Sequence, residues 1–166
     1  VKIPDEMPMA EASLIGCGVM TGVGAALYTA NVPGGSTVAV IGCGGIGLNI
    51  IQGCRIAGAA NIIAIDLMDS KLEMASQFGA THTINSKEVD LDEAIKEITK
   101  GEGVEYAFEA IGVPAAATQA FNMTRAGGTT VVVGMHPLGS EISIPGPAFL
   151  QEKKLIGCMY GSTRFR

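Results

Sequence analysis

The chain has 166 residues, 48% of them hydrophobic, which is enough apolar material for one buried core and predicts a single domain over residues 1–166. Its formal net charge is -5 and its Lys and Arg residues are scattered, which argues against a nucleic-acid surface. Neither an apolar run of membrane-spanning length nor a signal-peptide pattern stands out, so we expect a cytoplasmic protein without a membrane partner.

The four cysteines are far apart and form no C-x-x-C pair, so neither a disulfide scaffold nor a self-contained zinc knuckle is expected. The sequence begins without Met and ends abruptly at Arg166. We therefore expect a domain cut from a longer enzyme, with reduced thiols.

The first predicted element is a helix within residues 9–31, which is unusually rich in small residues. Four glycines interrupt it, and each lowers helix stability by about 1 kcal/mol relative to Ala in an exposed interior; they are Gly16, Gly18, Gly22 and Gly24. So much glycine predicts a close approach to another backbone or to a ligand.

A βαβ unit follows the turn at residues 33–35. A β-branched run over residues 36–41 is typical of a strand buried on both faces, and a glycine-rich loop and an amphipathic segment through Gly58 come after it. A second such run over residues 61–65 ends in Asp66. This order of strand, loop, helix, strand and acid is typical of dinucleotide binding, whereas a merely structural turn would leave the acid unexplained.

The glycines stand where a dinucleotide needs them. Gly42 permits a tight turn, Gly44 lets the backbone approach the pyrophosphate, and Gly47 lets the helix pack closely on the sheet. The pyrophosphate would then lie on the unpaired N–H groups near Gly45 and Ile46.

Asp66 lies 19 residues after Gly47, where a carboxylate can accept hydrogen bonds from the adenosine ribose. The same charge would repel a 2′-phosphate, and neither Leu67 nor Met68 offers a cation. The sequence therefore favours NAD over NADP.

The remaining pattern alternates helices and strands. Asp69 is expected to cap a helix that ends at Gly79, Asp90 with Glu93 to cap the next, and Pro114 to begin a third that runs to about Met123. The further strands are expected at residues 81–84, 104–108, 129–133 and 154–160. Together these elements predict an α/β fold, a doubly wound six-stranded parallel sheet of the Rossmann type.

Ligands of such sheets lie outside the carboxyl ends of the strands. Residues 42–47, Asp66, Ile111 and residues 133–135 all fall on that edge. Taken alone, Ile111 and Met135 could equally be loop or core residues. Neither His82 nor His136 has a second ligand at metal spacing, so surface or hydrogen-bonded polar roles are expected for both.

These motifs closely resemble those of the zinc-containing medium-chain alcohol dehydrogenases. The resemblance rests on the glycine-rich loop and on Leu14-Ile15-Gly16-Cys17-Gly18, Thr21-Gly22, Asp66, Lys71, Phe108-Glu109-Ala110-Ile111-Gly112, Val131-Val132-Val133-Gly134 and Gly157-Cys158. It covers nearly the whole chain but only the cofactor half of such an enzyme. The family's other zinc ligands and its proton-relay groups have no counterpart here.

The resemblance implies roles for single residues. Cys17 matches a catalytic zinc ligand, and the expected cofactor-binding residues are Thr21, Gly42, Gly44, Gly45, Ile46, Gly47, Asp66, Lys71, Ile111, Val133, Met135 and Cys158. Within this set, Asp66 and Lys71 would reach the adenosine ribose, while Ile111, Val133 and Cys158 would line the nicotinamide end. From spacing alone, Cys17 would instead be a small buried hydrophobe.

The implied function is that of the NAD-binding domain of a zinc-dependent dehydrogenase, which transfers hydride between an alcohol, or an aldehyde adduct, and NAD. One thiolate does not make a zinc site, so we expect no stable zinc, weak NAD binding and no activity in the isolated chain. Two alternatives stay open, a non-catalytic NAD-binding module and a domain of a zinc-free quinone oxidoreductase. Cys17 and Asp66 together disfavour the second.

The last predicted strand, residues 154–160, would lie at an open edge of the sheet. Exposed edges invite pairing with a second copy about a two-fold axis. The sequence therefore predicts a homodimer or homotetramer through this strand. The resemblance to dehydrogenases implies a similar arrangement.

Overall fold

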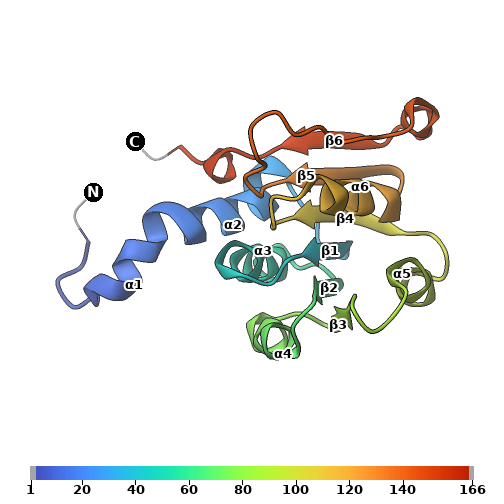
Figure 1. Ribbon diagram of the computed structural model, residues 1–166. Helices are drawn as coiled ribbons and strands as arrows, with labels where there is room; N and C mark the ends of the chain where they lie inside the picture. The colour runs from blue at the N-terminus through green and yellow to red at the C-terminus, as the bar shows by residue number, and fades with distance from the viewer. Residues whose placement is uncertain (1–2, 165–166) are drawn as a thin grey trace.

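The computed structural model describes residues 3–164. Six parallel strands form one sheet in the order β3-β2-β1-β4-β5-β6 (Figure 1). Their bounds are β1 Thr37–Ile41, β2 Asn61–Asp66, β3 His82–Asn85, β4 Val104–Glu109, β5 Thr124–Val132 and β6 Lys154–Gly157. The strand order reverses between β1 and β4, so the predicted doubly wound fold is confirmed.

Helices cover both faces of the sheet, with α3 and α4 on one side and α5 and α6 on the other (Figure 1). The bounds of these four are α3 Gly45–Ile56, α4 Asp69–Phe78, α5 Leu91–Thr99 and α6 Pro114–Met123. Each face has its own buried cluster, because successive side chains of a strand point to opposite faces. In β1, Val38 and Val40 belong to the cluster under α3, and Ala39 and Ile41 to the one under α5 and α6.

One helical rod leads into the sheet from the amino-terminal side. It comprises α1 Met9–Leu14, η1 Ile15–Val19, α2 Met20–Gly24 and η2 Ala25–Thr29, in which η1 and η2 are π-helical turns. Two of its glycines meet neighbouring backbone: a Cβ on Gly22 would lie 2.6 Å from the Ile46 carbonyl oxygen of α3, and one on Gly24 would meet Gly161. The predicted close approach is confirmed for these two, whereas Gly16 and Gly18 face open space.

The same rod corrects the expectation that no apolar segment reaches membrane-spanning length. Met9–Thr29 is a helix of 21 residues that is long and apolar enough to cross a membrane, judged by length and composition alone. The helix predicted within residues 9–31 is confirmed, and the two π-helical turns continue it without a break; its apolar length is what the sequence analysis did not recognise. The second half of the rod packs on α3, through Gly22 and through contacts of Ala26 and Val23 with Gly53.

Three element boundaries also differ from expectation. β5 begins at Thr124, before its two glycines, and the predicted sixth strand over 154–160 ends as β6 at Gly157. The chain then turns into the short helix η4, Tyr160–Ser162, because Gly161 adopts a φ of 66° and packs on Gly24. Asp69 does not cap α4; it is the helix's first residue, and its Oδ1 accepts a hydrogen bond from Asn85.

Candidate cofactor-binding site

The turn after β1 has the geometry that its glycines predict. Gly42 has a φ of 95°, which glycine adopts without strain, and a Cβ there would meet the Ile111 side chain. A Cβ on Gly47 would overlap the carbonyl oxygen of Gly42. Glycine at 42 and 47 is therefore required for the turn and for the close packing of α3 on the sheet.

Open space lies over the first turn of α3. The helix begins at Gly45, with Gly44 as its N-cap, and no side chain caps its amide groups. A Cβ built on Gly44 or Gly45 would find no neighbouring atom within 4 Å. Uncapped N–H groups at a helix N-terminus attract anions, so this surface fits a pyrophosphate.

Asp66 stands beside this turn at the end of β2. Its side chain is only 9% exposed, and Oδ2 accepts a hydrogen bond of 2.8 Å from the Cys43 amide. Oδ1 accepts from the Leu67 and Met68 amides at 2.8 and 3.2 Å. Asp66 thus also fixes the glycine loop to β2, a role that the sequence pattern did not reveal. The predicted ribose partner Lys71 places Nζ 3.9 Å from Oδ2.

A hollow of about 350 Å³ opens at this point of the sheet edge. It is lined by Ile41, Gly42, Gly44, Ile65, Asp66, Leu67, Lys71, Ser86, Ala110, Ile111, Ala116 and Gln119. Five residues expected from the sequence therefore meet in one place. Ile111 is among them, beside Gly42 and Asp66, although the resemblance assigned it to the nicotinamide end with Val133 and Cys158.

The other expected cofactor residues lie off this hollow. Val133 is buried beside the end of β4, and its neighbour Met135 is 94% exposed. Cys158 follows β6, and its sulfur accepts a hydrogen bond of 3.3 Å from Thr29. Thr21 is buried in α2. The structure brings Val133 and Cys158 to neighbouring strand ends, because the Cys158 amide donates to the Val132 carbonyl at 2.9 Å.

The cysteines separate into two groups. Cys17 is exposed on η1, so the alternative of a buried apolar residue is wrong in this structure. Burial raises the pKa of the Cys43 thiol to about 12, with a smaller contribution from the Asp66 charge, and burial alone raises that of Cys54 to about 12. Both therefore stay protonated at neutral pH and are poor metal ligands.

Zinc does not fit the residues that the structure describes. Among residues 3–164, no group of three His, Cys, Asp or Glu side chains could hold a metal ion. Cys17 alone supplies one ligand where a catalytic zinc takes three from the protein.

Glu109 is the functional candidate that the sequence analysis missed. It ends β4, is fully buried, and its Oε1 accepts hydrogen bonds from Ile111 at 2.8 Å and Gly112 at 2.5 Å. Its Oε2 lies 3.1 Å from Nε2 of His136, so the expectation of a hydrogen-bonded polar role for that histidine is confirmed. No local pattern marks this pair, because 27 residues separate its members.

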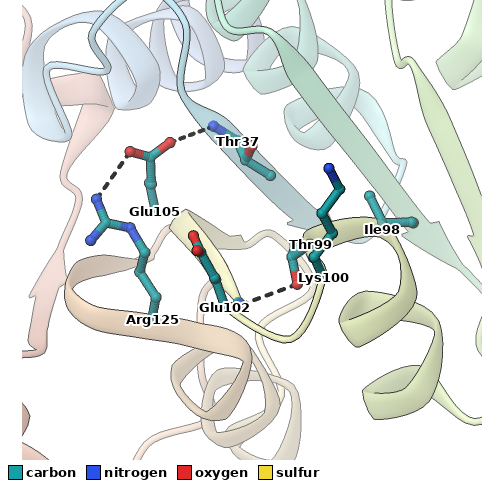
Figure 2. Close-up of a pocket in the computed structure, with 8 residues that line it drawn as sticks. Thr37, Ile98, Thr99, Lys100, Glu102, Glu105 and Arg125 are labelled. Carbon is teal, nitrogen blue, oxygen red and sulfur yellow. Dashed lines mark hydrogen bonds and ion pairs between the residues drawn. The ribbon is translucent and has the colours of Figure 1, made fainter.

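A larger hollow, of about 430 Å³, lies at the opposite edge of the sheet, where β1 and β4 begin (Figure 2). Figure 2 shows Glu105 between two partners, accepting 2.7 Å from the Thr37 amide and 3.0 Å from Arg125. These polar groups satisfy one another. Size alone would favour this hollow, but the uncapped helix, the glycine turn and the acid all lie at the carboxyl edge, where ligands of such sheets bind.

Comparison with known protein families assigns the fold to a group of enzymes. The family model described as zinc-binding dehydrogenase matches residues 45–166, from the first turn of α3 onward and well over half of the chain. The chain belongs to the zinc-binding dehydrogenase family. The resemblance drawn from the motifs is thereby confirmed.

Similar proteins agree with this zinc-binding dehydrogenase assignment. Alcohol dehydrogenase-like 5 of Arabidopsis thaliana is 43% identical over 99% of the chain and 43% of its own length. An alcohol dehydrogenase zinc-binding domain protein from Burkholderia ambifaria superposes with a TM-score of 0.93 at 40% identity, over 98% of this chain and 44% of that one.

A third structure, described as a zinc-binding dehydrogenase from Sinorhizobium meliloti and bound to NADP, has a TM-score of 0.86 at 29% identity. It is matched over 95% of this chain and 46% of its own. The present zinc-binding dehydrogenase chain thus spans less than half the length of each of these relatives.

Proposed function

We propose that this chain binds NAD at the carboxyl edge of its sheet and serves as the coenzyme half of an alcohol dehydrogenase. The pyrophosphate of NAD would lie on the amides that open α3, and the adenosine ribose of NAD would contact Asp66 and Lys71. Bound NAD would supply the hydride acceptor for oxidation of an alcohol to an aldehyde.

One observation supports this proposal most directly. The uncapped first turn of α3, the open space over Gly44 and Gly45, and the Asp66 carboxylate lie together at the β1–β2 end of the sheet. These groups complement the two polar parts of a dinucleotide, its anionic bridge and its sugar hydroxyls. Family membership favours a dehydrogenase over a free-standing NAD-binding module.

NAD is proposed over NADP because of charge. A 2′-phosphate would stand against a carboxylate whose oxygens already accept three backbone amides, and Lys71 is the one cation that the hollow offers. The Sinorhizobium meliloti structure described as a zinc-binding dehydrogenase is bound to NADP, so NADPH is the informative competitor for this site.

The zinc chemistry of the whole enzyme is a proposal of a different kind. Exposed Cys17 would supply one thiolate to a zinc ion whose other ligands come from outside the described residues. The alcohol or aldehyde substrate would also be bound largely by residues outside those that the structure describes. The relatives named alcohol dehydrogenases support this assignment.

Calorimetric titration with NADH and NADPH tests the site. The wild-type protein should bind NADH at least ten times more tightly than NADPH, a difference of about 1.4 kcal/mol or more. Asp66→Asn removes the charge that repels a 2′-phosphate but keeps one acceptor oxygen. The variant should bind NADH more weakly, and its NADH and NADPH affinities should differ less than those of the wild-type protein.

Asp69→Asn is the matched control, because it makes the same change of net charge three residues away, outside the hollow. It should leave both affinities unchanged. An Asp66→Asn protein with the wild-type preference would show that the acid is misassigned. Thermal melting of both variants separates a local effect from loss of the loop contact to Cys43.

A further inference from the structure

Glu109 joins two loops that are distant in sequence. Its Oε1 accepts hydrogen bonds from the amides of Ile111 and Gly112, at 2.8 and 2.5 Å, and lies 3.4 Å from that of Val113, in the loop after β4. Its Oε2 lies 3.1 Å from Nε2 of His136, in the loop after β5. A carboxylate oxygen accepts a hydrogen bond and an imidazole N–H donates one, so the two groups are a complementary pair.

The backbones of the two loops are also in close contact. Gly112 has a φ of 90°, and a Cβ there would meet the backbone of Met135. A Cβ on Gly134 would meet the backbone of Gly112 and Oε2 of Glu109. The amide of Gly134 donates to the Glu109 carbonyl at 3.0 Å. The carboxylate and the imidazole thus connect two loops whose backbones already lie too close for a side chain at Gly112 or Gly134.

This junction lies on the path of a dinucleotide across the sheet edge. The adenosine half is placed by Asp66 at the end of β2, and the pyrophosphate by the turn after β1. With the strand order β2-β1-β4-β5, the remaining half of the molecule extends toward the loops after β4 and β5. Those are the loops that Glu109 and His136 hold together.

We propose that Glu109 and His136 are positioning residues for the nicotinamide half of the dinucleotide. This inference deepens the proposed function and rests on it. Glu109 fixes the loop that carries Ile111, and His136 holds the Met135 loop against it. Neither side chain needs to touch the cofactor. His136 is 15% exposed and Glu109 is fully buried, as suits groups that act through the backbone they hold.

The test compares NADH with AMP, which carries only the adenosine half, by calorimetry on the intact protein. His136→Ala frees the Met135 loop but leaves Glu109 bound to its amides. This variant should bind NADH at least fivefold more weakly than wild type, and its affinity for AMP should stay within twofold of the wild-type value. His136→Gln should restore NADH binding, because its side-chain amide can donate to Oε2 as the imidazole does.

His82→Ala is the matched control, because His82 lies on β3, an edge strand that pairs with neither β4 nor β5, and the substitution should change neither affinity. The inference is overturned if His136→Ala binds NADH as tightly as wild type, if NADH and AMP weaken equally, or if His136→Gln fails to restore binding. Glu109→Gln gives a second test, since it weakens the contacts that hold the loop after β4 and should lower the affinity for NADH more than the affinity for AMP.

Amide hydrogen exchange keeps the two proposals apart. Exchange at Gly134 should be faster in His136→Ala than in wild type, with or without cofactor. If the wild-type protein binds neither NADH nor AMP, the proposed function fails while this exchange result still reports on the junction. If exchange at Gly134 is the same in His136→Ala as in wild type, while the wild-type protein binds NADH, the positioning role of Glu109 and His136 fails and the proposed function stands.

Discussion

Two glycines three residues apart, Gly44 and Gly47, have different roles in the turn after β1. Gly47 has no room for a side chain, because a Cβ would overlap the Gly42 carbonyl oxygen, whereas Gly44 faces open space. The first is therefore needed by the fold. The structure itself leaves room for a methyl group at the second, which the proposed dinucleotide would instead fill by approaching the backbone.

Replacing each glycine by Ala should therefore give opposite results. Gly47→Ala should lower the free energy of unfolding by about 1–3 kcal/mol through overpacking, a fall in Tm of about 2–4 °C for each kcal/mol. Gly44→Ala should lower it by about 1 kcal/mol or less, an N-cap effect, yet weaken NADH at least tenfold. Thermal melts and NADH titrations check both, and a Gly44→Ala protein with wild-type NADH affinity would contradict the assignment.

Strand β6 lies at one edge of the sheet, where it could pair with a second copy of the chain. It pairs with β5 on one side and is the last strand of the described sheet on the other. Large apolar side chains near it are exposed, among them Leu150 at 87% and Met159 at 79%. We propose that two copies pair here about a two-fold axis, through the four residues Lys154–Gly157 rather than the seven expected from sequence.

Sedimentation equilibrium at micromolar concentration tests this pairing. The wild-type protein should have the mass of a dimer or a tetramer. Leu155→Lys places a charge on the edge and should lower the mass by at least half, while Met74→Lys, on the exposed surface of α4, should not. A monomeric wild-type protein would rule the pairing out.

For the whole molecule, the sequence predicted what depends on neighbours along the chain. The glycine turn, the acid 19 residues later and the parallel strands all follow from local pattern, and the structure bears them out. Contacts between distant segments were not predictable in this way. Glu109 with His136, the hydrogen bond from Cys43 to Asp66, and the end of β6 at the contact of Gly161 with Gly24 all join segments far apart.

The central claim is that a dinucleotide lies across the carboxyl edge of this sheet. A crystal structure of the protein with NADH tests it most directly. The pyrophosphate oxygens should lie about 2.7–3.2 Å from the amides that open α3, and the adenosine ribose hydroxyls at similar distances from Asp66. NADH bound instead in the hollow between Lys100 and Arg125 at the opposite edge, or an empty turn after β1 at saturating NADH, would contradict the account.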